Sequence, residues 1–173
     1  MGARVKRAVG GGAVVPSGAA AILGIDPGAK SGACVLSLGA PPWTAVVNDW
    51  RGREAAVARA IDAACGGRVV AAIEAHNHHG AWSRAAQTAV AEHVGRWIHA
   101  CEARGVEVVR VDSRVWYTRV VGGSQKDPRE ARIATTRALA ARVLGRDVTA
   151  DEAAAWAIAR YAEGTLALGR RPG

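Results

Sequence analysis

Short apolar runs alternate with longer amphipathic segments along most of this sequence. The short runs predict five strands: AAILGID (ending at residue 26), ACVLSL (33–38), TAVVNDW (44–50), RVVAAIE (68–74) and VEVVRV (106–111). The longer segments predict helices over 53–65, 80–105, 127–145 and from about 150. Short Gly- and Pro-rich connections join the first three strands, so we expect an antiparallel meander. Helices join the first, fourth and fifth strands, so these should run parallel, with the fourth beside the first.

Two of the expected helices begin with recognisable capping sequences. Asp127, Pro128 and Glu130 fit the N-cap, N1 and N3 positions of the helix over 127–145. Thr149 and Glu152 form a T-x-x-E capping box at the start of the last helix. We therefore expect Glu152 to cap this helix.

The chain is predicted to hold one α/β domain between two short tails. Residues 1–20 are basic, lack acids and are rich in small residues, so we expect a flexible tail. The domain should span 21–168, and 169–173 should form a short C-terminal tail. No apolar run approaches the ~18 residues of a membrane span, so we expect no membrane association.

Charge and cysteine content narrow the function classes. The formal net charge is +8 and the pI is about 10.4, which indicates a polyanionic partner, with nucleic acid the leading candidate. The three cysteines, Cys34, Cys65 and Cys101, are far apart and form no CxxC pair, which predicts neither a disulfide framework nor a zinc site. This usage fits a reducing cytoplasm. We expect the cytoplasm of a bacterium or a phage host in preference to an organelle.

Candidate chemistry lies where two of the expected strands end. Asp26 ends the first strand and Glu74 ends the fourth, so their carboxylates should meet at one sheet edge, roughly 4.8 Å apart. Like charges held this close repel unless a cation separates them, and Mg²⁺ prefers such oxygen ligands. Asp151, near the start of the last helix, could close the site from above.

Three motifs together resemble those of the RuvC-type Holliday junction resolvases, in the ribonuclease-H-like (retroviral integrase) superfamily. They are GIDPG (24–28), AIEA (72–75) and TADEAAAWAIA (149–159), and the likeness runs from about Ile22 to Glu163. The resemblance implies the ribonuclease-H-like α/β fold, a mixed five-stranded sheet flanked by helices. It also implies a homodimer that makes paired symmetric nicks in four-way DNA junctions, using two Mg²⁺ or Mn²⁺ ions.

The resemblance assigns Asp26, Glu74 and Asp151 as metal ligands, and places Ala154 where the family has a further acidic or histidine ligand. Residues three apart on a helix share a face, so the side chain of Ala154 would face the metal ions without binding them. Either the site is naturally degenerate or an Asp→Ala change has disabled it. The flanking sequence favours the change, since DEADAWAIA would match the family better. Lys126 loosely matches a lysine that the family uses near the scissile phosphate.

Further residues are candidates for DNA contact, each with a structural alternative. Lys30 and Ser31 could instead make the turn after GIDPG, the HNHH cluster could bind metal, and about half of the arginines should be solvated surface. His76 and Asn77 stand where bacterial relatives place an aromatic wedge. The candidate DNA-binding set is Lys30, Ser31, His76, Asn77, His78, His79, Arg114, Arg119, Lys126 and Arg129.

The helix expected over 80–105 is the candidate dimer element. Small residues and tryptophans recur along it at three- and four-residue steps: Trp82, Ala86, Ala89, His93, Trp97 and Ala100. This stripe could equally cover the sheet. Four of the tryptophans are expected in the core or at an interface more often than as base-stacking residues: Trp82, Trp97, Trp116 and Trp156. Two other functions stay open: a catalytically inactive, structure-specific DNA-binding protein, and a related nuclease acting on flaps, branched DNA or RNA–DNA hybrids.

Overall fold

The computed structural model describes residues 19–75 and 83–166. In chain order the elements are β1 (Ala19–Asp26), β2 (Ser31–Ser37), β3 (Ala40–Val47), α1 (Trp50–Ala63), β4 (Arg68–Ala75), α2 (Arg84–Glu102), β5 (Glu107–Asp112), α3 (Ser113–Trp116), the π-helix η1 (Tyr117–Val121), α4 (Arg129–Leu144) and α5 (Ala150–Leu166). Strand β1 thus begins inside the segment predicted as a tail. Residues 1–18 and the predicted tail 169–173 lie outside the described residues.

The sheet has the predicted topology. Its strand order is β3-β2-β1-β4-β5. The pairs β1–β2 and β2–β3 are antiparallel, whereas β1–β4 and β4–β5 are parallel. The meander and the position of the fourth strand beside the first are therefore confirmed.

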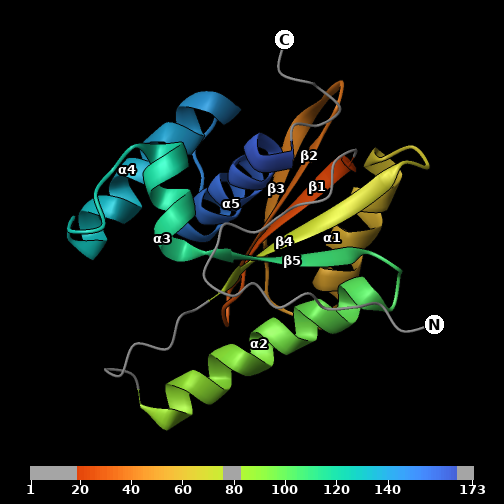
Figure 1. Cartoon of the computed structure of the whole chain (residues 1–173), viewed down its shortest axis with the longest axis horizontal. Coiled ribbons are helices and arrows are strands. Elements are labelled where there is room, and N and C mark those ends of the chain that lie inside the picture. Colours follow the sequence, from red (N-terminus) through yellow and green to blue (C-terminus); the bar gives the residue numbers. More distant parts are fainter. Residues whose placement is uncertain (1–18, 76–82, 167–173) are drawn as a thin grey trace.

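Helices cover both faces of this sheet. Helices α1 and α2 lie on one face, and α3, α4 and α5 lie on the other (Figure 1). Successive residues of β1 contribute to opposite layers, since Ile22 packs in the core with α5 whereas Leu23 and Ile25 pack in the core with α1. Burial on both faces explains why the central strands are apolar almost throughout rather than alternating.

Helix α5 lies unusually close to β1 and β2 because two glycines face it. A Cβ added to Gly24 would lie 2.3 Å from the carbonyl oxygen of Ala155, and one added to Gly32 would lie 1.8 Å from that of Asp151. Both distances are shorter than any side chain tolerates. The absent side chains let the helix backbone rest directly on the strands.

The third strand and the first helix differ from their predicted bounds. Strand β3 covers Ala40–Val47 and not 44–50, and it includes Pro41 and Pro42, which an edge strand tolerates. Helix α1 begins at Trp50, because the carboxylate of Asp49 caps it by accepting a hydrogen bond of 2.7 Å from the backbone N–H of Gly52. The prediction continued the strand through this cap.

The predicted cap of α4 is wrong. The N-cap residue is Pro128, which has no side-chain capping bond. The carboxylate of Asp127 instead accepts hydrogen bonds from the Tyr117 hydroxyl (3.0 Å) and the Ser124 backbone N–H (2.8 Å). The partner Tyr117 belongs to η1, which with α3 occupies a segment predicted as loop.

Glu152 caps α5 as predicted. The backbone N–H of Thr149 donates to its carboxylate (2.9 Å), and its own backbone N–H donates to the Thr149 hydroxyl (3.2 Å). The carboxylate also accepts from Thr44 of β3 and from Arg146. Burial acts to raise the pKa of Glu152, but the bonds from Arg146, Thr149 and Thr44 outweigh it and lower the pKa to about 2.

The described tryptophans that were expected in the core are there: Trp97, Trp116 and Trp156 are all buried, and Trp82 lies outside the described residues.

The two halves of helix α2 differ in burial. Trp97 and Cys101 in its C-terminal half pack on the sheet, whereas Ala86 and Ala89 near its start are exposed. None of the described helices combines the length and apolarity that crossing a membrane requires.

Replacement of Gly32 by alanine should destabilise the fold. The added Cβ meets backbone rather than a movable side chain, so we expect the free energy of unfolding to fall by roughly 3 kcal/mol. Gly95→Ala is the matched control, because a Cβ there meets nothing within 4 Å in the middle of α2. That variant should gain about 0.5–1 kcal/mol from reduced backbone entropy. Urea titrations followed by circular dichroism check both values, and equal stability of the two variants would contradict this packing.

Glu152→Gln should destabilise the protein by roughly 2 kcal/mol at neutral pH, through weakened charged hydrogen bonds. Because folding lowers the pKa of Glu152, its stabilising effect is present above the ordinary value of 4.5 and is lost as the pH falls toward 2. The difference in melting temperature between the two proteins should therefore shrink from pH 7 to pH 2. The control Glu92→Gln breaks an exposed pair with Arg96 and should change little. A difference independent of pH would argue against the cap.

Candidate active site

Asp26 and Glu74 lie side by side at one edge of the sheet. The parallel register pairs Ile25 with Ile73, so the next residue on each strand carries a carboxyl group to the same place. Burial raises the pKa of Asp26 well above its ordinary value, and the charge of Glu74, a hydrogen bond with Glu74 and the charge of Asp151 raise it further. The predicted meeting of these two carboxyl groups is present in the structure.

Asp151 reaches this edge from α5. Its backbone lies over Gly32, and Gly32 is the β2 partner of Asp26 in the sheet. Burial raises the pKa of Asp151, the positive charge of Lys30 lowers it in part, and Glu152 raises it. We call Asp26, Glu74 and Asp151 the carboxylate site.

Trp116 fixes the position of Glu74. Its indole Nε1–H donates a hydrogen bond of 3.1 Å to Oε1 of Glu74, and both side chains are buried. The sequence predicted a core position for Trp116 but not this role. The available signal was topological: β5 lies beside β4, so the residues directly after β5 reach the edge that carries Glu74.

Ala154 lies one turn after Asp151 on α5. Both residues are partly exposed, whereas Glu152, Ala153 and Ala155 are buried. Glu152 is bound to Thr44 and Arg146, so its carboxylate is already occupied as a cap. The methyl group of Ala154 packs at the margin of the core and offers no ligand atom.

The donor chemistry at the carboxylate site fits a hard divalent cation. Two adjacent carboxyl groups supply oxygen ligands, and a cation between them would offset both causes of the raised pKa of Asp26, its burial and the charge of Glu74. Across 19–75 and 83–166, however, no group of three or more His, Cys, Asp or Glu side chains is gathered closely enough to hold a metal. The pair of Asp26 and Glu74 is therefore the tightest part of the candidate site, and Asp151 stands further off.

The two candidates on the turn after β1 differ in exposure. Lys30 is exposed, and its charge acts on Asp151. Ser31 is fully buried: its hydroxyl donates to the Gly28 carbonyl (2.8 Å) and accepts from the Gly28 N–H (3.2 Å) and the Trp97 indole (3.0 Å). Ser31 thus makes the turn, and contact with DNA would require that turn to open.

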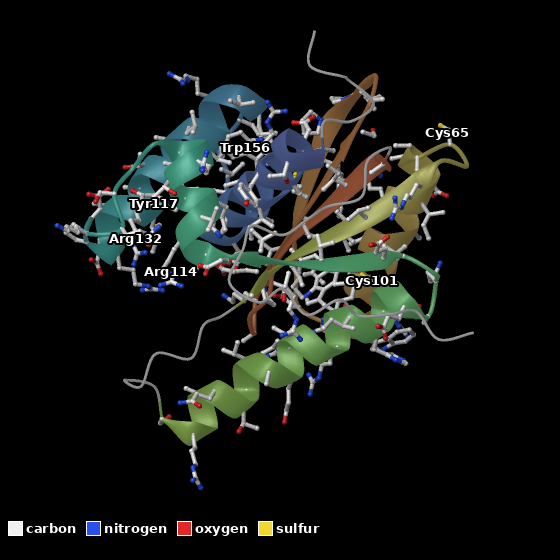
Figure 2. The ribbon with its side chains drawn as sticks, in the orientation of Figure 1. Cys65, Cys101, Arg114, Tyr117, Arg132 and Trp156 are labelled. Atoms are coloured by element: carbon white, nitrogen blue, oxygen red, sulfur yellow. The ribbon has the colours of Figure 1, made fainter. Side chains whose placement is uncertain are left out.

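The arginine candidates lie on the surface on or beside α3, η1 and α4. Arg114, Arg119 and Arg129 are exposed. The guanidinium of Arg114 pairs with Asp112 at 3.1 Å, and Asp112 ends β5 at the same sheet edge as Glu74. Arg114 is labelled in Figure 2. His76, Asn77, His78 and His79 fall outside the described residues.

Lys126 is exposed on a loop. Neighbouring residues of this loop contact Tyr117, which directly follows Trp116, the hydrogen-bond partner of Glu74. The neighbouring Asp127 binds the hydroxyl of Tyr117, and Gly123 packs so closely on the Tyr117 ring that an added Cβ would lie 2.2 Å from its hydroxyl. Arg132 of α4 covers the same ring, with its Cζ 5.9 Å from the centroid (Figure 2). The residue before Tyr117 is Trp116, the partner of Glu74.

The chain is similar in fold to solved RuvC structures. No protein-family model and no curated protein matches it. A Thermus thermophilus RuvC structure is 17% identical with a TM-score of 0.59, and the match covers 85% of this chain and 95% of that one. T. thermophilus RuvC in complex with a Holliday junction substrate is 18% identical with a TM-score of 0.61, covering 86% and 94%. The chain therefore has the ribonuclease-H-like α/β fold of these structures, as its three motifs predicted.

Proposed function

We propose that this chain is a divalent-cation-dependent endonuclease that acts on four-way DNA junctions. The observation that carries the proposal is the placement of Asp26 beside Glu74, with Asp151 held over the same sheet edge. The fold shared with RuvC, one structure of which contains a Holliday junction substrate, supports the choice of DNA junctions as the substrate class. The net charge of +8 suits a phosphate-rich partner.

In this proposal Asp26 and Glu74 hold Mg²⁺ or Mn²⁺, and Asp151 contributes from α5. A bound divalent cation would supply Lewis acidity toward the scissile phosphodiester and lower the pKa of a water molecule. Trp116 keeps one oxygen of Glu74 in place, so this ligand is oriented before any cation arrives. Lys30, exposed near Asp151, would neutralise charge on the phosphate.

DNA contacts are proposed along the surface beside this site. The exposed side chains of Lys126, Arg114, Arg119 and Arg129 would bind backbone phosphates, because Lys and Arg on one surface attract a duplex whatever its sequence. The segment with His76, Asn77, His78 and His79 follows β4 directly in the sequence. In this proposal it would contact the DNA strands near the centre of the junction. Lys126 remains a proposal, supported by the ties from its loop to Tyr117.

A homodimer is proposed through the N-terminal half of α2. Ala86 and Ala89 are small and exposed there, so a second helix could approach closely. The C-terminal half of the same helix already covers the sheet through Trp97. In this proposal the dimer contact uses the N-terminal half of the helix, and the contact with the sheet uses the C-terminal half. Two nicks at symmetric positions in a junction require two copies of the carboxylate site.

Ala154 supports a second candidate function. A chain with no ligand at this position would bind junctions without cutting them, either because an acid there has been replaced by alanine or because the protein acts as a structure-specific DNA-binding protein. Loss of one carboxylate should weaken cation binding far more than DNA binding, since the proposed phosphate contacts are made elsewhere.

Ala154→Asp should turn a junction-binding chain into a junction-cutting one. We expect the unaltered chain to retard a labelled four-way junction in a native gel. In Mg²⁺ or Mn²⁺ it should nick this junction slowly or not at all. The aspartate variant should nick it at paired symmetric positions, at least roughly 10- to 100-fold faster, which is the cost typical of disturbing metal ligation. Denaturing gels of the labelled strands measure this rate.

A linear duplex of the same sequence and the double variant Ala154→Asp with Asp26→Asn serve as controls, and neither should give symmetric nicks. Rapid cutting by the unaltered chain would show that position 154 needs no ligand. If neither form prefers the junction over the duplex, the proposed substrate is wrong, and flaps, branched DNA and RNA–DNA hybrids become the substrates to test.

A further inference from the structure

A pocket lies away from the carboxylate site, between the start of α1 and the C-terminal half of α2. Both helices belong to the face of the sheet opposite α5 (Figure 1). The pocket has a volume of about 510 Å³, within the range of sites that hold small ligands. Its walls include Asp49, Trp50, Arg53 and Glu54 at the start of α1, and Arg96 and His99 of α2.

The Nε–H of Arg53 is a buried donor with no hydrogen-bond acceptor in the described chain. The residue as a whole is only 5% exposed. Its described contact is with the indole of Trp97, whose ring centroid lies 6.0 Å from Cζ. A buried guanidinium donor costs free energy until an acceptor reaches it. The wall of the pocket therefore holds a buried donor that the acceptor group of a bound ligand would satisfy.

The charges around Arg53 also favour the binding of an anion. Burial lowers the pKa of Arg53, the like charge of Arg96 lowers it further, and the charge of Asp49 offsets this only in part. Two guanidinium groups that repel each other across one pocket would both be stabilised by an anion between them. His99 lies one turn after Arg96 on α2 and lines the same pocket.

The two acids in the pocket wall are already engaged. The carboxylate of Asp49 accepts the capping bond from Gly52, and that of Glu54 pairs with Arg104 at 3.7 Å. Arg96 has an exposed partner in Glu92 at 3.4 Å, but such surface pairs contribute little. No acid of the described wall thus reaches the guanidinium of Arg53.

Two more features favour a phosphate that carries an aromatic group. The first turn of α1 contains no acidic residue, so its remaining backbone N–H groups add to the positive potential that the N-cap carboxylate of Asp49 partly offsets. Trp50 lines the pocket and is 60% exposed, and the guanidinium of Arg51 lies 5.7 Å from its ring centroid. An exposed indole beside a cationic pocket suits stacking by a nucleobase.

We propose that this pocket binds a nucleotide phosphate, with Arg53 and Arg96 holding the phosphate and Trp50 stacking on the base. The phosphate belongs either to a nucleotide within a DNA strand or to a free nucleotide, since the chemistry of recognition is the same. Binding here does not depend on the proposed nuclease activity, because none of the pocket residues belongs to the carboxylate site.

Titration calorimetry without divalent cations tests this pocket. The titrants are inorganic phosphate, deoxyadenosine monophosphate and a short single-stranded oligonucleotide, each added to the full chain. Arg96→Gln, on the surface, should weaken binding of the mononucleotide on the order of 10-fold, the effect of losing one charged hydrogen bond. Arg53→Gln should weaken it at least as much, and Trp50→Ala should weaken the mononucleotide but not inorganic phosphate.

Arg59→Gln is the matched control. It removes the same charge from the same helix, but Arg59 packs over Trp43 outside the pocket, with Cζ 5.2 Å from that ring centroid. This variant should bind like the unaltered chain. If Arg53→Gln does not fold, as judged by circular dichroism, Arg96→Gln decides the outcome.

The titrants also separate the two sources of phosphate. Tighter binding of the oligonucleotide than of the mononucleotide assigns the pocket to a DNA strand, and the reverse order assigns it to a free nucleotide. An absence of binding by all three titrants overturns the proposal. Equal weakening by Arg59→Gln and Arg96→Gln also overturns it, because it would reveal general attraction to a basic surface. Failure of junction cleavage leaves each of these outcomes unchanged.

Discussion

The close contact between α5 and strands β1 and β2 is the constraint that organises both the core and the candidate site. Gly24 and Gly32 have no side chains to hold the helix away, so its backbone rests on the sheet. The same contact places Asp151 above Gly32, the cross-strand neighbour of Asp26. One packing interaction therefore contributes to the core on one face of the sheet and also brings the carboxylate of Asp151 to carboxylates from the first half of the chain.

The carboxylate site carries a destabilising charge arrangement that its surroundings maintain. Burial raises the pKa of Asp26, and repulsion from the neighbouring Glu74 raises it further. Trp116 prevents Glu74 from turning away, and the capping bonds of Glu152 fix the start of the helix that carries Asp151. These supports hold the acids together before a ligand is present, as expected of a site built to bind a cation.

Sequence patterns predicted the features that depend on local chemistry or on burial. Strand β4 was found almost to the residue because its apolar run ends at an acid, and the cap at Glu152 followed from Thr149 three residues earlier. Features that depend on tertiary partners were missed. Asp127 has the sequence of a helix cap, but the Tyr117 hydroxyl competes for its carboxylate. The bond from Trp116 to Glu74 joins residues 42 apart in the chain, so no local pattern could reveal it. The roles of Ala154 and Lys126 rest on the resemblance to RuvC and remain proposals.

If the carboxylate site binds a divalent cation, with Asp26 and Glu74 brought together by the β1–β4 register and Asp151 held over them by α5, an ion should be visible between Asp26 and Glu74. The most direct test is a crystal structure of the unaltered chain grown in Mn²⁺, with anomalous diffraction used to locate the ion. We expect an anomalous peak between the carboxylates of Asp26 and Glu74, with the Trp116 indole still bound to Glu74. A structure at saturating Mn²⁺ that has no anomalous peak there, and in which the two carboxyl groups are hydrogen-bonded to each other, would contradict the proposed cation site.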